Sequence, residues 1–174
     1  VLAYRQIRSE LEELAGRLNG EHAELDWTPL RYIHRNIDRN VLAKLYRGAR
    51  VGMVTPLADG MNLVAKEYIA AQDPEDPGVL VLSHLAGAAE DLTEALLVNP
   101  YDIEGMSEAL SQALDMPFKE RKRRYTACMD QVVKTDVKVW CNSFISALEA
   151  CEVPLAWGNS TMNLNPQKTL KPTT

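Results

Sequence analysis

The chain has 174 residues, of which 46% are hydrophobic and 25% charged, a balance typical of one globular domain with its own core. Its formal net charge of −5 argues against a general nucleic-acid-binding surface, which needs an excess of basic residues. No apolar run approaches the roughly 20 residues of a membrane-spanning helix. We therefore expect neither nucleic acid nor a membrane as a partner.

The cysteines indicate the compartment. There are three, Cys128, Cys141 and Cys151, and no two of them stand in a C-x-x-C spacing. This number and spacing predict neither a disulfide framework nor a zinc site. We expect no metal and no cofactor, and free thiols favour a reducing, cytoplasmic location.

The first predicted elements are helical. Apolar side chains recur at helical spacing over residues 2–19, and the Asn-Gly pair at residues 19–20 is a helix-ending signal. A short strand is predicted over residues 30–33. A second helix is predicted over residues 38–46, with Asp38 as its N-cap.

The rest of the chain alternates strands and helices. The predicted strands are residues 51–55, 79–83 and 95–98, and the predicted helices are residues 62–71, 102–114, a basic helix that begins at Pro117, and 132–150. The strands are continuous apolar runs, which is typical of a parallel sheet covered on both faces. The pattern predicts an α/β, doubly wound parallel sheet of Rossmann-like type. Residues 151–174 are rich in Pro, Asn and Thr, and we expect them to be a disordered tail.

The segment with the clearest chemistry is residues 55–67, Thr-Pro-Leu-Ala-Asp-Gly-Met-Asn-Leu-Val-Ala-Lys-Glu. It joins a predicted buried strand to a predicted helix, and open α/β sheets bind ligands at the carboxyl ends of their strands. A helix N-terminus offers free backbone N–H groups and a partial positive charge, which together bind phosphate. Gly60 has no Cβ and lets the backbone approach a ligand.

Two acids bracket this segment. Asp59 and Glu67 are eight residues apart, which is about 12 Å along a helix. Ionised carboxylates accept hydrogen bonds from sugar hydroxyls. The spacing therefore suits a sugar nucleotide, with a hexose at Asp59, a diphosphate at the helix start and a ribose at Glu67. A simple N-cap at Asp59 and a solvated acid at Glu67 are the alternatives that spacing alone leaves open.

The string Asp-Gly-Met-Asn-Leu-Val-Ala-Lys-Glu at residues 59–67, with Val-Thr-Pro-Leu before it, resembles the donor-site signature of trehalose-6-phosphate synthases. Other segments are similar to the same family, namely residues 27–30, 74–82, 86–89 and 98–102. The likeness covers residues 1 to about 150. The resemblance implies the C-terminal half of a GT-B glycosyltransferase fold.

The resemblance also implies roles for individual residues. Asp59, the catalytic-site residue, would contact hydroxyls of the transferred glucose. Four backbone amides would meet the glucose and the diphosphate: those of Gly60, Met61, Asn62 and Leu63. The UDP would be lined by Leu63, Val64, Ala65, Lys66 and Glu67, with Glu67 on the ribose hydroxyls. Ile37 would meet the uracil edge through its backbone, where many relatives have an aromatic residue.

The implied reaction transfers glucose from UDP-glucose to glucose 6-phosphate and gives trehalose 6-phosphate with retention. In this family a front-face substitution is expected, in which the leaving phosphate helps to take the acceptor proton. Asp59 would orient the donor and would not be the nucleophile.

The resemblance covers only part of the family's architecture. The acceptor site and the first segment of the donor domain have no counterpart in this sequence. We therefore expect residues 1–150 to be a donor-binding domain without its first segment, inactive alone. The expected partners are an N-terminal domain of the same protein and further copies in a homo-oligomer.

Three other functions stay open. The first is a related GT-B transferase with another donor or acceptor, such as a pseudo-glycosyltransferase. The second is a non-catalytic regulatory domain of the same fold, although the presence of both Asp59 and Glu67 disfavours a degenerate copy. The third is a plain nucleotide-binding α/β domain. The sequence holds neither a G-x-G-x-x-G nor a P-loop string, which disfavours dinucleotides and ATP.

Overall fold

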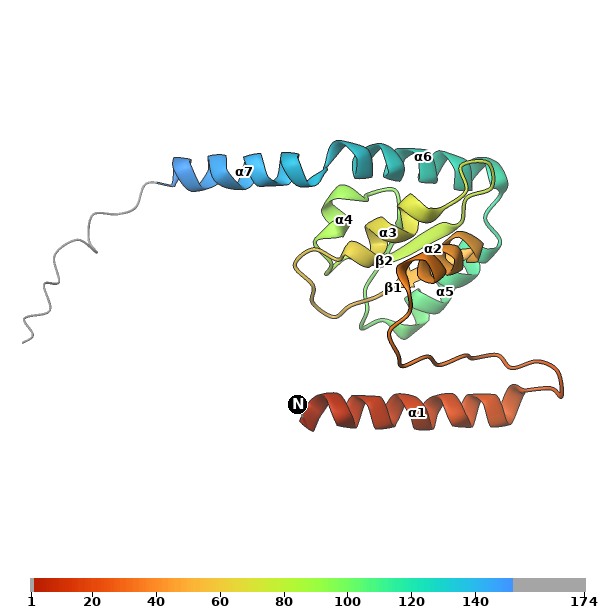
Figure 1. Ribbon diagram of the computed structural model, residues 1–174. Coiled ribbons are helices and arrows are strands. Elements are labelled where there is room, and N and C mark those ends of the chain that lie inside the picture. The colour runs from red at the N-terminus through yellow and green to blue at the C-terminus, as the bar shows by residue number, and fades with distance from the viewer. Residues whose placement is uncertain (1, 152–174) are drawn as a thin grey trace, which may run out of the picture. The chain divides into compact units, whose positions relative to one another are not determined.

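The computed structural model describes residues 2–151. The chain divides into two compact units, one ending at Gly48 and the other beginning at Ala49 (Figure 1). The predicted disordered tail lies, apart from Cys151, outside the described residues.

The first unit begins with α1, Leu2–His22. The predicted end at residues 19–20 is wrong by two residues, because Gly20 stays helical and does not take the left-handed conformation of a helix-ending glycine. The amide of Asn19 has another use. It donates to the Leu30 carbonyl at 2.9 Å and accepts from the Leu30 N–H at 3.0 Å.

The strand predicted at residues 30–33 is also wrong, since these residues belong to no strand. A strand is stabilised by a ladder of hydrogen bonds to a neighbour, whereas both backbone groups of Leu30 are bonded to Asn19. The helix predicted next is confirmed as α2, Arg39–Gly48. Asp38 accepts a hydrogen bond from the Asn40 N–H at 2.8 Å, as an N-cap residue does.

The second unit is built on a three-stranded parallel sheet in the order β1-β2-β3 (Figure 1). The strands are β1, Val51–Val54, β2, Val79–Ser83, and β3, Leu96–Val98. In the register, Val51 lies opposite Val79 and Val81 opposite Leu96. The predicted α/β parallel architecture is thereby confirmed.

Helices cover both faces of the sheet. On one face α5, Ile103–Leu114, packs against all three strands. The buried core there consists of Val79, Val81, Leu96, Val98, Ala113 and Met116. Alternation along β2 directs Leu80 and Leu82 to the other face, where α3, Leu63–Ala71, and α6, Phe118–Lys134, pack on the strand and on each other. The short helix α4, Ala88–Asp91, contacts both α3 and α6.

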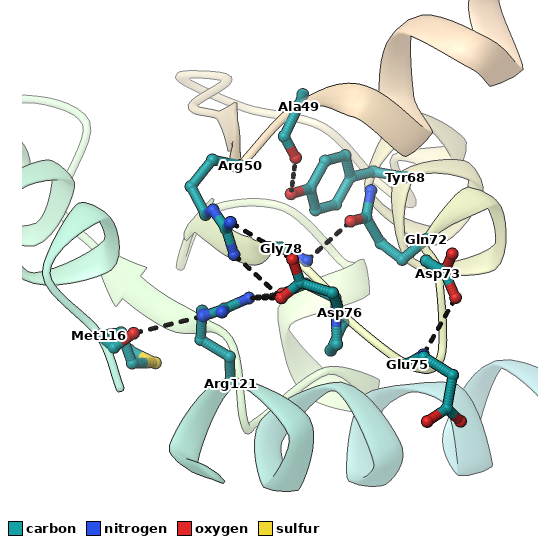
Figure 2. Close-up of polar contacts among 11 residues, drawn as sticks. Ala49, Arg50, Tyr68, Gln72, Asp73, Glu75, Asp76, Gly78, Met116 and Arg121 are labelled. Carbon is teal, nitrogen blue, oxygen red and sulfur yellow. Dashed lines mark hydrogen bonds and ion pairs between the residues drawn. The ribbon is translucent and has the colours of Figure 1, made fainter. Parts of the chain in front are cut away.

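A buried arginine fastens the loop that precedes β2 (Figure 2). Arg121 of α6 is only 8% exposed, and its guanidinium donates to Asp76 at 2.8 Å, to the Met116 carbonyl at 3.3 Å, and to the Pro77 carbonyl. Arg50 also pairs with Asp76, at 3.3 Å. Arg121 first, and then Arg50, lower the pKa of the Asp76 carboxyl.

The same region holds two further hydrogen bonds, one to the segment before β1 and one to the segment before β2 (Figure 2). The Tyr68 hydroxyl donates to the Ala49 carbonyl at 3.0 Å, and burial raises the pKa of Tyr68 to about 12. The side-chain oxygen of Gln72 accepts from the Gly78 N–H at 2.8 Å. These bonds therefore join the end of α3 to the segments that lead into β1 and β2.

The helix predicted over residues 132–150 is in fact two. α6 ends at Lys134, and α7, Val137–Ala150, begins after Asp136. The Asp136 carboxylate accepts hydrogen bonds from the N–H groups of Lys138 at 3.0 Å and Val139 at 2.9 Å. An N-cap of this kind starts a new helix, which the apolar periodicity of the sequence did not show.

No residue of α7 is buried in the chain. Its exposed apolar side chains are Val137, Val139, Trp140, Phe144, Ile145 and Leu148. Trp140 and Phe144 stack on each other with ring centroids 5.4 Å apart. Within residues 2–151 no helix combines the length and the apolar character that crossing a membrane requires.

Candidate functional site

The loops that follow β1 and β2 meet at the carboxyl edge of the sheet. The Asp59 N–H donates to the Leu85 carbonyl at 3.3 Å, and the Asp59 carbonyl accepts from the Gly87 N–H at 2.9 Å. The Ala88 N–H then donates to the Met61 carbonyl at 2.6 Å. These backbone bonds hold the turn at residues 59–61 in place, at the edge where open α/β sheets bind ligands.

Two glycines take part in this junction for different reasons. A Cβ added to Gly87 would overlap the Gly60 carbonyl group, with 2.8 Å to its carbon, so the two loops can approach only with glycine at position 87. A Cβ added to Gly60 would meet nothing within 4 Å. Gly60 does not have a positive φ either. The fold therefore does not require glycine at position 60.

The carboxylate of Asp59 is held by the residues that follow it. One oxygen accepts from the Met61 N–H at 3.0 Å, and the other accepts from the side-chain amide of Asn62 at 3.0 Å. The Met61 N–H first, and then the Asn62 amide, lower the pKa of Asp59. The group is therefore ionised at neutral pH and keeps acceptor capacity, since each carboxylate oxygen has two lone-pair directions.

Asn62 starts the helix. Its φ of 73° and ψ of 87° are left-handed, and it is the one non-glycine residue with positive φ in the part of the chain that the structure describes. Its side-chain oxygen accepts from the Ala65 N–H at 2.9 Å and caps α3. The N–H groups of the first helical turn have no partner within the helix, and the helix dipole adds a partial positive charge beside Asp59.

The remaining predicted residues of α3 divide by exposure. Leu63 is 60% exposed and Val64 is also exposed, whereas Ala65 is fully buried. The Lys66 ammonium lies 2.6 Å from the Asp91 carboxylate of α4, so its charge joins the two helices. Glu67 is half-buried one helical turn beyond Leu63.

Ile37 lies apart from these residues in the chain. It precedes α2 in the unit that ends at Gly48, whereas residues 59–67 belong to the second unit. The structure brings Asp59, Met61 and Asn62 into direct contact.

Two features of the site were missed in the sequence. The string at residues 86–89 was noted, but Gly87 and Ala88 were given no role, and the side chain of Asn62 was overlooked. The available signal for Gly87 was the run of small residues at 86–89, which begins three residues after the buried strand β2 ends. His84, which also follows β2, has its Nδ1 2.9 Å from the Val98 carbonyl. Within residues 2–151, no three His, Cys, Asp or Glu residues lie together as a metal site.

The fold and the turn together define a parallel α/β domain in which a fixed carboxylate lies beside a capped helix N-terminus. Comparison with known proteins places that domain. The chain belongs to glycosyltransferase family 20, whose family model matches residues 1–150. The solved relatives have the GT-B architecture, and the α/β Rossmann-like fold of this chain agrees with it.

Curated relatives are similar over most of this chain. The trehalose-6-phosphate synthase of Sinorhizobium fredii is 56% identical over 147 residues, which cover 84% of this chain and 32% of the relative. That of Sodalis glossinidius is 55% identical over 149 residues, with 86% and 32% covered. The chain spans about a third of the length of the curated relatives it matches.

Solved structures of trehalose-6-phosphate synthases are also similar to this chain over most of its length. An E. coli protein bound with UDP-2-fluoro glucose superposes with a TM-score of 0.82 at 53% identity, covering 87% of this chain and 34% of that one. A UDP-forming alpha,alpha-trehalose-phosphate synthase from Burkholderia xenovorans, in complex with glucose-6-phosphate, gives a TM-score of 0.81 at 59% identity. It covers 84% of this chain and 32% of its own.

Proposed function

We propose that this chain supplies the donor site of a retaining glucosyltransferase that moves glucose from UDP-glucose to glucose 6-phosphate and forms trehalose 6-phosphate. The observation that carries the proposal is the fixed turn at residues 59–62 before α3, in a chain more than half identical to trehalose-6-phosphate synthases. Relatives have been solved with a UDP-glucose analogue and with glucose-6-phosphate, which supports both substrates.

The hexose and the diphosphate bind at the turn. Asp59 accepts hydrogen bonds from hydroxyls of the glucose, for which its oxygens have capacity. The backbone amides from Gly60 to Leu63 meet the glucose and the diphosphate, and the open space at Gly60 admits the ligand. This assignment is supported by the bonds that fix Asp59 before any ligand arrives.

The nucleoside binds along α3. Glu67 accepts from the ribose hydroxyls, and the exposed Leu63 and Val64 line the path between. Ala65 contributes backbone only, since its side chain is buried. Lys66 contributes its aliphatic stem, because its ammonium pairs with Asp91. The backbone of Ile37 meets the uracil.

The chemistry of the site is positioning and charge stabilisation. The N-terminus of α3 stabilises the negative charge that develops on the departing diphosphate. Asp59 orients the sugar, and its lowered pKa makes it a weak base. The proton of the acceptor hydroxyl then goes to the leaving phosphate, and no side chain of this turn takes it.

We propose residues 1–150 as a donor domain whose remaining segments belong to the same longer protein. The share of 32% of the relatives' length supports this, as does the apolar surface of α7. A homo-oligomer and a cytoplasmic location complete the proposal. The odd number of cysteines and the lack of a C-x-x-C spacing support a reducing compartment.

Calorimetry on the full-length protein tests the donor assignment. UDP-glucose, UDP, ADP-glucose and GDP-glucose are titrated into the wild type and into Glu67→Ala. The expected result is a preference for UDP and UDP-glucose and a loss of at least tenfold in the variant, or ~1.4 kcal/mol. Glu108→Ala, an exposed acid of α5, is the matched control and should bind like the wild type.

Two results would contradict the proposal. Unchanged affinity in a folded Glu67→Ala variant would mean that the ribose contact is wrong. No binding of any of the four ligands to the wild type would favour a non-catalytic regulatory domain.

A further inference from the structure

We propose that Asn62 is a positioning residue, whose side-chain amide joins Asp59 to the N-terminus of α3 and so holds the hexose contact and the diphosphate contact in register. The inference rests on the proposed function, because it needs Asp59 to meet the hexose. It goes beyond that function by giving the Asn62 side chain a role that its backbone contacts do not require.

Both ends of the Asn62 amide are used. The nitrogen donates to the Asp59 carboxylate at 3.0 Å, and the oxygen accepts from the Ala65 N–H at 2.9 Å. A flipped amide would set its oxygen against the carboxylate and its N–H groups against the Ala65 N–H. Only one orientation therefore satisfies both neighbours.

The backbone of Asn62 argues in the same direction. A left-handed conformation, here with φ of 73°, is adopted by glycine and, among residues with a Cβ, mainly by asparagine and aspartate, whose short polar side chains can hydrogen-bond locally. The Asn62 side chain has such a local use. That use is the pair of bonds to Asp59 and Ala65.

The consequence is a carboxylate fixed at both oxygens. The Met61 N–H holds one oxygen of Asp59 and Asn62 holds the other, so neither rotation of the side chain is free. The turn is itself bonded to Gly87 and Ala88. When a group that orients a reacting sugar is displaced by ~1 Å, the reaction rate can fall by ~100-fold. A link that fixes the position of Asp59 should therefore raise the reaction rate.

Two variants in the full-length protein separate positioning from simple capping. Asn62→Asp tolerates the left-handed conformation and still accepts from the Ala65 N–H, but it replaces the donor to Asp59 by a second carboxylate. Asn62→Gly fits the backbone and removes both bonds. If Asn62 only caps α3, the Asp variant behaves like the wild type and the Gly variant is impaired.

The positioning role predicts the opposite order. Asn62→Asp lowers kcat/KM for UDP-glucose by about tenfold or more, and further than Asn62→Gly does. The new carboxylate also raises the pKa of Asp59, so the acid limb of the kcat/KM profile moves up by about one pH unit or more. The other titratable groups on the neighbouring elements are Lys66 and Glu67 on α3, Glu90 and Asp91 on α4, and His84 in the loop. These groups are the same in the wild type and in Asn62→Asp, so a difference between the two pH profiles is due to the substitution.

A double-mutant cycle completes the test. In an Asp59→Ala background, Asn62→Gly should lower kcat/KM by clearly less than it does in the wild-type background, because only the cap on the Ala65 N–H is then left to lose. The inference would be overturned if the fold-losses in kcat/KM of Asp59→Ala and Asn62→Gly simply multiply in the double variant. It would also be overturned if Asn62→Asp, in a folded protein, has wild-type kinetics. Either result would leave the proposed function standing. A wild type that neither binds UDP-glucose nor transfers glucose would overturn both. Thermal unfolding of each variant shows that it is folded.

Discussion

A single buried side chain, Arg121, holds together three parts of the second unit. Its guanidinium serves a carboxylate and two backbone carbonyls, those of Pro77 and Met116. Without it, the carbonyl of the buried Pro77 would lose its donor. An unsatisfied buried acceptor costs the full desolvation of that group, so Arg121 should matter more to stability than any exposed arginine of the same helix.

Arg121→Ala should lower the local free energy of unfolding around β2 by about 2 kcal/mol, the usual range for hydrogen bonds to a charged group. Native-state hydrogen exchange of the β2 amides in the full-length protein measures this directly. Arg123→Ala is the matched control, because Arg123 lies two residues away and pairs with Glu94 and Glu120 at the surface. Equal effects of the two substitutions would mean that Arg121 has no special role.

At the residue scale, the sequence indicated the charged and glycine positions of the site but not their contacts. Asp59 and Gly60 stand in a recognisable string, and the structure places them at the carboxyl edge of the sheet. The roles of Asn62 and Gly87 depend on a left-handed φ and on the approach of two loops distant in sequence. Neither property can be deduced from one residue type, since asparagine and glycine occur in many turns.

Among the elements, the junction of the loops after β1 and β2 is the structural basis of the site. It sets the turn at residues 59–61 by backbone hydrogen bonds to residues 85–88, before α3 begins. The conformation of the turn therefore depends on the loop after β2 as well as on α3.

A pair of glycine substitutions tests this junction. Gly87→Ala should displace the turn and lower both the thermal midpoint and the affinity for UDP-glucose, because its Cβ overlaps Gly60. Gly60→Ala should leave the thermal midpoint within a degree or two, as ~0.5 kcal/mol or less is typical of a change that meets nothing. It should still weaken UDP-glucose binding. A Gly60→Ala variant that binds normally would show that the ligand does not approach there.

The predictions of strands and helices failed where long-range contacts or helix caps determine which element forms and where it ends. The strands at residues 51–54 and 79–83 are apolar enough to be read from composition alone. The segment at residues 30–33 has a similar pattern but forms no strand, and both backbone groups of Leu30 are bonded to the Asn19 side chain. The division between α6 and α7 depends on the Asp136 cap, which lies within an otherwise continuous helical period.

For the whole molecule, the chain corresponds to about a third of its curated relatives, and α7 leaves its apolar side chains exposed. Contiguous exposed apolar surface of this kind promotes association in water.

Residues 1–174 prepared alone should therefore self-associate and show no glucosyl transfer. Replacing the stacked pair, Trp140→Ser with Phe144→Ser, should reduce association by removing the largest apolar groups of α7. The control is Asn142→Ala with Ser143→Ala, two exposed polar positions of the same helix. Analytical ultracentrifugation measures the mass, and a monomer at high concentration in the unaltered chain would contradict the prediction.

The central claim is that UDP-glucose binds at the turn and first helical turn of residues 59–67. Hydrogen exchange of the full-length protein, with and without saturating UDP-glucose, tests it most directly, because the amides proposed to hold the ligand are the ones observed. If UDP-glucose binds there, adding it should slow exchange in peptides covering residues 59–67 and leave exchange unchanged at residues 103–108, the start of α5. Unchanged exchange at residues 59–67, with protection appearing elsewhere when the ligand is bound, would contradict it.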